Sequence, residues 1–311
     1  MFSNALALRS TCTCTLIVWV AVLVSTSTAE TPREITLSNG VTMPTVAFGT
    51  WHYNDSYASS GVALAVQAGF RSIDTANDYF NQAGTGEGIG AVISAGTVSR
   101  NDLFVTSKVE GCGVPHPPHG TPVRLGSCHD DTLTVFEENL RLLKLPFVDL
   151  MLVHKPPPGG CSAENCPRMQ EQWAAFETML GEGKARAIGV SNYCISCLEC
   201  LAKTWKVAPV VNQIQLHVGM GPDPEGLVSY CRAKNIQVQA YSPLDVDQAN
   251  GTAELITGAL TNGIGLAHGN KSGATVALKW LAQQRVPLVT KAHSLKYLLR
   301  TIHYSWRRWM C

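Results

Sequence analysis

The sequence predicts an α/β protein: an eight-stranded parallel (β/α)8 barrel with an N-terminal β-hairpin. The first observation is that short apolar runs alternate with longer segments of helical periodicity, eight times along the 311 residues. The second is that eight such units close into a barrel more readily than they build an open sheet. The third is that no GxGxxG run follows the first predicted strand, which disfavours a doubly wound dinucleotide-binding domain.

The first expected element is a hairpin at residues 35–44, because two short runs flank Asn39-Gly40, a dipeptide typical of tight turns. Eight strands rich in apolar and β-branched residues follow it. They are predicted at residues 45–51, 70–75, 103–109, 148–153, 185–190, 210–216, 236–241 and 286–291. Alternation with helices implies right-handed crossovers, so the carboxyl ends of all these strands should meet at one end of the barrel.

Helices are expected between the strands, bounded by residues that commonly start or end helices. They are predicted at residues 61–68, 86–95, 131–143, 170–180, 198–206, 224–234 and 272–284. Gly69 follows the first of them, Gly181 and Gly183 follow the fourth, and Pro224 opens the sixth. The nearest match to a glycine-rich phosphate loop, residues 84–90, follows the second strand and has the wrong spacing.

Composition and charge exclude several classes of protein. The formal net charge is +1, which argues against nucleic acid as a partner. Hydrophobic residues make up 45% and charged residues 15%, so the chain can build a large core and is not disordered by composition. The sequence shows no interdomain linker and no internal repeat, and it does not predict an oligomeric state.

The N-terminus predicts a signal peptide at residues 1–29, which leaves residues 30–311 as a single barrel domain. An apolar run at residues 16–24 follows Arg9, and Ser27 and Ala29 supply the small residues that precede a cleavage site. The run is short for a membrane span. We therefore expect the secretory pathway, the ER lumen or secretion, and no membrane contact after cleavage. A signal anchor, organelle targeting and a gene-model artefact are the alternatives.

Cysteine usage fits an exported chain. Cys112 and Cys128 bracket one loop, Cys161 and Cys166 bracket another, and either pair could form a disulfide in an oxidising lumen. The run formed by Cys194, Cys197 and Cys200 offers an iron–sulfur interpretation, but no fourth cysteine follows closely. We expect a packed or disulfide-bonded helix face there, and no metal site.

Polar residues stand at or just beyond the ends of three consecutive predicted strands: Asp74, Tyr79, Lys108 and His154. A tyrosine hydroxyl has a pKa near 10, and a neighbouring Lys⁺ favours the phenolate and lowers that pKa. A carboxylate keeps the lysine charged, and a histidine can hydrogen-bond a carbonyl oxygen beside the tyrosine. Each residue alone has a structural explanation, such as a turn cap for Asp74. Together they could protonate a developing alkoxide.

Four segments in order resemble the aldo-keto reductase family. They are residues 69–79 (GFRSIDTANDY), 145–154 (LPFVDLMLVH), 183–193 (GKARAIGVSNY) and 211–214 (VNQI). The resemblance covers about residues 35–300. It implies that Tyr79 is the general acid, that Asp74 and Lys108 tune it, and that His154 orients the substrate carbonyl.

The resemblance also implies NADPH/NADP+ as the cofactor, lying across the barrel mouth. Ser191, Asn192 and Gln213 match positions that hold the carboxamide, and Tyr241 matches the residue that stacks on the nicotinamide. Further matches are the cofactor contact Thr50, the pyrophosphate contacts Ser242 and Leu244, the adenosine 2′-phosphate contact Lys291 and the substrate-pocket residues Trp51 and His154.

The chain departs from the family at two places. After Lys291 the tail at residues 301–311 lacks helical periodicity, so the last helix and the C-terminal loop look truncated, which should cost stability. A Gly/Pro/Cys-rich insert at residues 154–168 replaces the aromatic residue usual after His154. Together with the loop at residues 112–128, it is expected to line the substrate pocket.

These observations favour NADPH-dependent reduction of a small aldehyde or ketone. One alternative runs the same chemistry in reverse, as an alcohol dehydrogenase. A second is a truncated, non-catalytic barrel that binds cofactor or regulates. A redox-sensing role for the cysteine-rich helix would require thiols of low pKa, which nothing in the sequence indicates.

Overall fold

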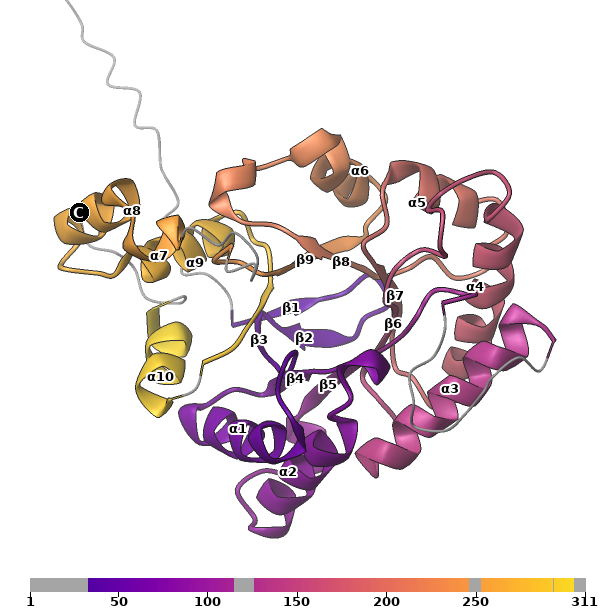
Figure 1. The fold of residues 1–311 in the computed structure, drawn as a ribbon, viewed down its shortest axis with the longest axis horizontal. Coiled ribbons are helices and arrows are strands. Elements are labelled where there is room, and N and C mark those ends of the chain that lie inside the picture. The colour runs from indigo at the N-terminus through magenta and orange to yellow at the C-terminus, as the bar shows by residue number, and fades with distance from the viewer. Residues whose placement is uncertain (1–32, 115–125, 246–252, 293, 305–311) are drawn as a thin grey trace, which may run out of the picture.

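The chain folds into a closed barrel of eight parallel strands, as the sequence predicts (Figure 1). In this computed structural model, the structure describes residues 33–114, 126–245, 253–292 and 294–304. The barrel strands are β3 (Val46–Gly49), β4 (Ser72–Asp74), β5 (Phe104–Val109), β6 (Leu150–Val153), β7 (Ile188–Ser191), β8 (Val211–Gln215), β9 (Gln237–Tyr241) and β10 (Leu288–Thr290). They pair in chain order, and β10 closes the ring by pairing with both β3 and β9.

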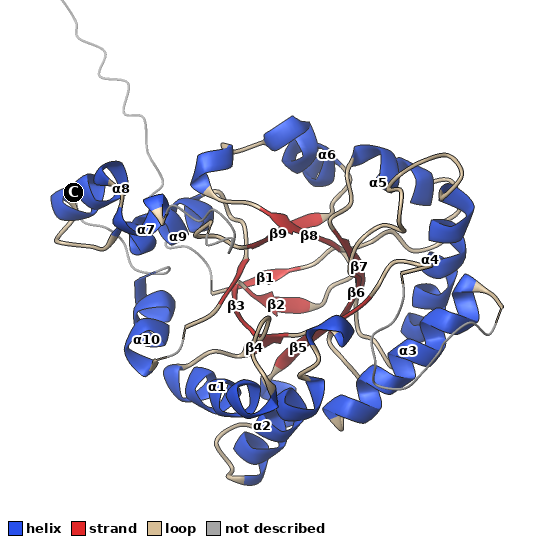
Figure 2. Cartoon of the chain, in the orientation of Figure 1, coloured by secondary structure: helices blue, strands red, loops and turns tan. Residues whose placement is uncertain are grey.

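The predicted hairpin is present and lies across the N-terminal end of the barrel (Figure 2). Its strands, β1 (Glu34–Thr36) and β2 (Thr42–Pro44), pair in antiparallel register. Met43 and Leu37 are buried and join a cluster with Phe104, Leu150 and Val211, which come from the starts of barrel strands. The hairpin therefore closes the bottom of the barrel and leaves the opposite end for a site.

Helices surround the barrel (Figure 2). They are α1 (Asp55–Ala68), α2 (Gln82–Ser94), α3 (Cys128–Leu143), α4 (Cys166–Gly181), α5 (Ile195–Leu201), α6 (Leu227–Ala233), α7 (Glu254–Thr257), α8 (Ala259–Ala267), α9 (Gly273–Gln283) and α10 (Leu295–Tyr304). Helix α1 starts six residues earlier than predicted because Asn54 caps it, accepting a hydrogen bond from Tyr57 N at 2.9 Å. Helix α5 ends at Leu201 rather than at residue 206, and the sequence did not predict α7 and α8.

The expectation that residues 301–304 are not helical is wrong. Helix α10 continues through them and packs beside α1 (Figure 1). Leu298 is fully buried, and Leu295, Leu299 and Ile302 contact the same core. These four positions recur at helical spacing, so one face of α10 covers part of the barrel. Residues 305–311 of the tail lie outside the described residues.

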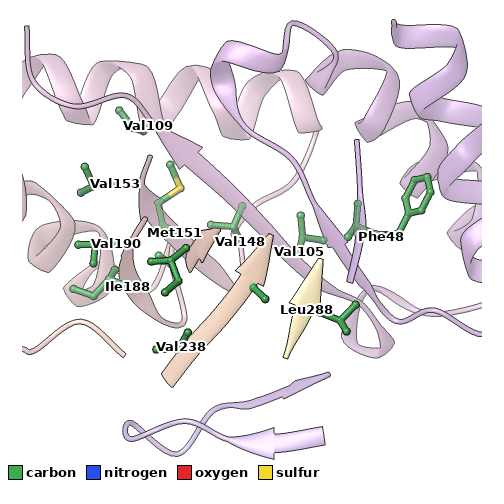
Figure 3. Close-up of a cluster of buried hydrophobic side chains, with 14 of the residues drawn as sticks. Phe48, Val105, Val109, Val148, Met151, Val153, Ile188, Val190, Val238 and Leu288 are labelled. Carbon is green, nitrogen blue, oxygen red and sulfur yellow. The ribbon is translucent and has the colours of Figure 1, made fainter. Parts of the chain in front are cut away.

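Alternation along each strand separates the apolar core from the functional end. Most outward-facing residues of β5, β6 and β7 are apolar and pack under the helices, among them Val105, Met151, Ile188 and Val190 (Figure 3). The intervening residues point into the barrel, where they are apolar near the hairpin. In β5, for example, Phe104 lies at the bottom and Lys108 at the top.

The glycine-rich stretch in α2 serves helix packing. A Cβ at Gly84 would overlap the backbone of Asp55, and one at Gly86 would lie 2.5 Å from the Leu143 carbonyl oxygen. Gly84 N donates to Asp55 Oδ1 at 2.7 Å. The glycines therefore let α2 approach α1 and α3 closely, which agrees with our rejection of a phosphate loop here.

The predicted cysteine pairs are correct in one case. Cys112 and Cys128 form a pair with Cα atoms 5.7 Å apart. Cys161 and Cys166 do not pair with each other. They pair with Cys197 and Cys200 on α5, at Cα distances of 4.9 and 5.7 Å respectively, because the insert after β6 packs against α5. Cys194 remains unpaired, with its Sγ 3.1 Å from that of Cys161.

Asp149 stabilises the start of β6 through a buried ion-pair cluster. Its side chain is fully buried and accepts hydrogen bonds from Arg100 at 2.8 Å, Arg186 at 2.7 Å and Val105 N at 2.9 Å. Arg100 also stacks over the Phe147 ring at 4.2 Å. The Asp149 carboxylate thus connects the segments that carry Arg100 and Arg186 to the start of β5.

Asp149→Ala should lower the free energy of unfolding by about 3–5 kcal/mol, because it leaves two cations and a buried N–H without their acceptor. Urea unfolding measures this loss. Glu138→Ala is the matched control, since its pair with Arg141 is solvent-exposed and should be worth about 0.5 kcal/mol or less. Equal losses in the two variants would contradict the structural role of Asp149.

The structure does not test the predicted signal peptide, since residues 1–32 lie outside the described residues. Within the described ranges, no helix is both long and apolar enough to cross a membrane.

Candidate active site

Asp74, Lys108 and Tyr79 meet inside the barrel mouth. Asp74 ends β4, Lys108 points inward from β5, and Tyr79 ends a short 3-10 helix, η1 (Asn77–Tyr79), that follows β4. The buried Lys108 Nζ donates to Asp74 Oδ1 at 2.6 Å, to the Thr75 carbonyl at 3.1 Å and to the Tyr79 hydroxyl at 3.1 Å. All three donor positions of the ammonium group are used, so its geometry is fixed.

The electrostatics of this cluster differ in part from the sequence prediction. Lys108 acts on the Tyr79 pKa in the predicted direction, downward, but burial has the larger effect and the pKa of Tyr79 is raised above its ordinary value. Burial lowers the pKa of Lys108, whereas Asp74 and Tyr79 raise it by more, so Lys108 stays protonated. Tyr79 therefore holds its proton throughout the neutral pH range, as a general acid must.

His154 lies beside Tyr79, just beyond β6. The two rings meet edge to face with centroids 5.6 Å apart. His154 Nδ1 lies 2.9 Å from Asp78 Oδ1 and 3.0 Å from Glu110 Oε1. Burial lowers the pKa of His154, but the two carboxylates raise it more, and the pKa ends above its ordinary value.

Four predicted carboxamide and ring contacts form a connected set on β7, β8 and β9. Ser191 Oγ donates to the Gln213 carbonyl at 2.8 Å and accepts from Asn192 Nδ2 at 3.1 Å. Asn192 Nδ2 also donates to the His154 carbonyl at 2.9 Å, and Asn192 Oδ1 accepts from the Tyr241 hydroxyl at 2.7 Å. These bonds fix the Tyr241 ring and connect this set to the His154 backbone.

Gln213 joins this set to the catalytic candidates. Its Nε2 donates to Asp74 Oδ2 at 2.8 Å and to Gln239 Oε1 at 2.9 Å, so both amide hydrogens are used. Its side-chain amide oxygen, Oε1, accepts no hydrogen bond from the described residues. An acceptor at this place is what a carboxamide N–H would need.

Three further predicted residues lie on the opposite side of the mouth, after β3 and β10. Thr50 is fully buried, and its hydroxyl bonds to the Asp74 carbonyl at 3.3 Å and to Asn81 Oδ1 at 3.2 Å. Trp51 is 42% exposed. Lys291 Nζ donates to the Trp51 carbonyl at 2.7 Å and lies over the Tyr53 ring, 5.1 Å from its centroid.

Ser242 and Leu244 follow β9, near this side of the mouth. Ser242 has a φ of 46°, in the left-handed region, which turns the chain sharply after Tyr241. Leu244 is half-buried and packs against the main core. The loop that follows, residues 246–252, lies outside the described residues.

The sequence prediction missed several residues of the site. Asp78 and Glu110 flank His154, Gln239 binds Gln213, and Asn81 Nδ2 donates to the Thr50 and Tyr53 carbonyls at 2.7 and 2.8 Å. Glu110 had a usable signal, because it lies two residues beyond Lys108, on the same face of the chain. Asn81 had none, since it lies in a loop.

The comparisons with known proteins agree with this geometry. The model of the Aldo/keto reductase family matches residues 45–306. The chain belongs to the aldo/keto reductase family. It is 35% identical over 273 residues to the uncharacterized oxidoreductase YtbE of Bacillus subtilis, covering 86% of this chain and 87% of that protein. It is 34% identical over 261 residues to the glyoxal reductase of the same organism, with coverages of 83% and 82%.

Solved structures show the same fold. An aldo/keto reductase from Brucella melitensis superimposes with a TM-score of 0.72 at 28% identity, covering 87% of this chain and 92% of that one. A Bombyx mori aldo-keto reductase in complex with NADP has a TM-score of 0.72 at 26% identity, with coverages of 89% and 88%. This aldo/keto reductase is therefore an oxidoreductase built on a (β/α)8 barrel.

Proposed function

We propose that this aldo/keto reductase reduces aldehydes or ketones to alcohols with NADPH, and that Tyr79 is the proton donor. The observation that carries the proposal is the contact of Tyr79 with Lys108 and Asp74, with His154 edge to face against the same ring. A glyoxal reductase and a probable NAD(P)H-dependent D-xylose reductase among the relatives support a carbonyl substrate.

The chemistry follows from the positions of these groups. When bound, the dinucleotide supplies the hydride that is added to the carbonyl carbon. The Tyr79 hydroxyl gives its proton to the developing alkoxide oxygen, and the Lys108 ammonium group stabilises the phenolate left behind. Asp74 holds Lys108 in place at 2.6 Å. His154 donates a hydrogen bond that fixes the carbonyl oxygen beside Tyr79.

The residues present fit a nicotinamide dinucleotide. Gln213 Oε1 is an acceptor that the described residues do not use, and the Tyr241 ring is held by its hydroxyl at Asn192. Ser191, Asn192 and Gln213 would hold the carboxamide, and Tyr241 would stack on the ring. Thr50, Ser242 and Leu244 would contact the rest of the dinucleotide, while Trp51 and His154 would face the substrate.

Activity of the purified 30–311 chain tests the proposal. We expect NADPH oxidation with glyoxal and with an aromatic aldehyde, and tighter binding of NADPH than of NADH by fluorescence titration. Alcohol oxidation with NADP+ as the faster direction would favour the reverse reaction. A folded chain that neither binds NADPH nor turns over would favour the non-catalytic barrel.

Lys291 should select NADPH over NADH. A charge-assisted hydrogen bond to a 2′-phosphate is worth about 1.5–3 kcal/mol, so Lys291→Met should raise the KM for NADPH roughly 10- to 100-fold and leave the KM for NADH unchanged. Steady-state kinetics with both cofactors measure this. Lys203→Met, at an exposed lysine after α5, is the control. An equal rise for both cofactors would exclude selection by Lys291.

We further propose that the chain enters the secretory pathway and that the three cysteine pairs are disulfides there. The paired Cα atoms lie 4.9–5.7 Å apart, within the range of disulfides. Cleavage after Ala29 is tested by N-terminal sequencing of the secreted protein. An N-terminus that starts at Met1 would overturn the signal peptide.

Removal of one disulfide should destabilise the secreted protein. The double variant Cys166→Ser/Cys200→Ser should lose about 2–4 kcal/mol of unfolding free energy, because the unfolded chain regains loop entropy. Urea unfolding with and without a reductant measures this loss, and the reductant should abolish the difference. Alkylation of Cys166 in the unreduced wild-type protein would contradict the pairing.

A further inference from the structure

The surroundings of His154 extend beyond the residues so far assigned to the reaction. Its Nδ1 faces two carboxylates, Asp78 Oδ1 at 2.9 Å and Glu110 Oε1 at 3.0 Å. They come from two elements, since Asp78 lies in η1 and Glu110 follows β5. Lys155 Nζ lies 3.0 Å from the other oxygen of Glu110. The resulting row of charged groups, Lys155, Glu110, His154 and Asp78, contacts the catalytic candidate Tyr79 through the His154 ring.

The fold builds this row at a close backbone approach. A Cβ at Gly111 would overlap the Lys155 carbonyl oxygen and would lie 2.7 Å from the Pro156 backbone. Glycine at this position therefore lets the loop after β5 lie against the segment after β6. That contact brings Glu110, only 2% exposed, within 3.0 Å of His154 Nδ1.

The protonation of Nδ1 follows from these contacts. None of the three facing atoms, Nδ1, Asp78 Oδ1 and Glu110 Oε1, is aligned for a hydrogen bond with any described group. A bare Nδ1 lone pair would bring a third electron-rich atom within about 3 Å of two carboxylate oxygens, which is repulsive at low dielectric. The two carboxylates therefore favour a proton on Nδ1.

The state of Nε2 then decides what His154 can do. In neutral imidazole one nitrogen donates and the other accepts, so a proton on Nδ1 leaves Nε2 an acceptor that cannot hydrogen-bond a carbonyl oxygen as donor. In imidazolium both nitrogens donate. The described residues make no hydrogen bond to Nε2, so it is available to a substrate.

We propose that Asp78 and Glu110 are positioning residues that hold His154 as an imidazolium, with Nε2–H as the donor to the substrate carbonyl. This inference rests on the proposed reductase function. His154 transfers no proton in this scheme: it donates a hydrogen bond, while Tyr79 supplies the proton. Once His154 loses its charge, Nε2 accepts instead, which suits an alcohol hydroxyl. Carbonyl reduction should therefore weaken at high pH.

Several other groups face His154 and act on its charge. Lys108 repels the imidazolium across the Tyr79 ring, and burial also disfavours the charge. Asp78 and Glu110 oppose both effects, and the net result is a raised pKa for His154. The pKa of Asp78 is lowered: burial raises it, but the contact with His154 and the charge of Lys108 act in the opposite direction. Lys155 is half-exposed and pairs with Glu110.

Nuclear magnetic resonance titration of the imidazole nitrogens tests the charge without any turnover. The His154 signal is assigned by its loss in His154→Gln. In the wild-type protein we expect a midpoint above 6.5, with Nδ1 remaining the protonated nitrogen on the alkaline side. Asp78→Asn should lower the midpoint by about one pH unit or more. Glu110→Gln should shift it in the same direction.

A matched control comes from a second His–Asp pair. His129 Nδ1 lies 3.0 Å from Asp130 Oδ1 at the exposed start of α3, so Asp130→Asn should leave the His154 midpoint unchanged. In carbonyl reduction, Asp78→Asn should lower the apparent pKa of the alkaline limb of kcat/KM by as much as it lowers the His154 midpoint. A midpoint that is the same in wild type and Asp78→Asn, or an alkaline neutral form with the proton on Nε2, would overturn the inference. An absence of NADPH oxidation would instead overturn the reductase proposal.

Discussion

Tyr79→Phe is expected to lower kcat for carbonyl reduction by about 10³-fold, within the range usually lost with a general acid. The variant keeps the ring and its edge-to-face contact with His154, and removes only the hydroxyl that Lys108 contacts at 3.1 Å. Lys108 keeps its bonds to Asp74 and to the Thr75 carbonyl. The fold and NADPH binding should therefore survive, which places the loss in the chemical step.

Steady-state NADPH oxidation measures kcat, and fluorescence titration measures the affinity for NADPH. Tyr57→Phe, at a 63% exposed position on α1, is the matched control and should retain wild-type kcat. If Tyr79→Phe kept more than about a tenth of the wild-type kcat, another group would have to supply the proton. Loss of NADPH binding along with activity would mean that the variant had disturbed the site.

The barrel could be predicted from the sequence because its signals are local. Each strand is a short apolar run between turn residues, and eight of them were found close to their observed positions. Boundaries failed where a side-chain cap decided them, as at Asn54, which starts α1 six residues early. Helix α10 was missed in part because residues 301–311 were judged apart from residues 295–300, which hid the helical spacing from Leu295 to Ile302.

The candidate site was predictable to the extent that it lies on strand ends. Asp74, Lys108 and Gln213 all point inward from strands, so their convergence follows from alternation and parallel pairing. Tyr79 was expected in the loop after Asp74, but the short 3-10 helix that brings its hydroxyl to Lys108 was not predicted. The pairing of Cys161 with Cys197 could not be predicted, because it joins an irregular insert to a helix 36 residues away.

The direction of the Tyr79 pKa shift could not be predicted from the sequence. Neighbouring charges can be inferred from strand order, and Lys108 does lower the pKa. The amount of burial cannot be inferred, and here it outweighs the charge. The direction of the pKa shift therefore required the folded structure.

Lys108→Met should have the second large effect, on both stability and activity. The buried pair with Asp74 has a separation of 2.6 Å, and removal of one partner leaves the other charge uncompensated, at a cost of about 3–5 kcal/mol. The pKa of Lys108 is raised in the folded state, so its stabilising effect is complete below about pH 10.5 and is lost as the pH rises through the raised value. The free energy of unfolding of Lys108→Met should therefore not show this decrease at alkaline pH.

A second substitution separates the structural role of Lys108 from its catalytic role. In Lys108→Met/Asp74→Asn, no buried charge is left unpaired, and the asparagine still offers an acceptor to Gln213 Nε2, which lies 2.8 Å from Asp74. Urea unfolding should therefore show most of the lost stability restored. Activity should stay down by about 10²-fold or more, because no cation remains to stabilise the Tyr79 phenolate. Recovery of activity together with stability would show that Lys108 supports the fold alone, and the proton donor would then need another partner.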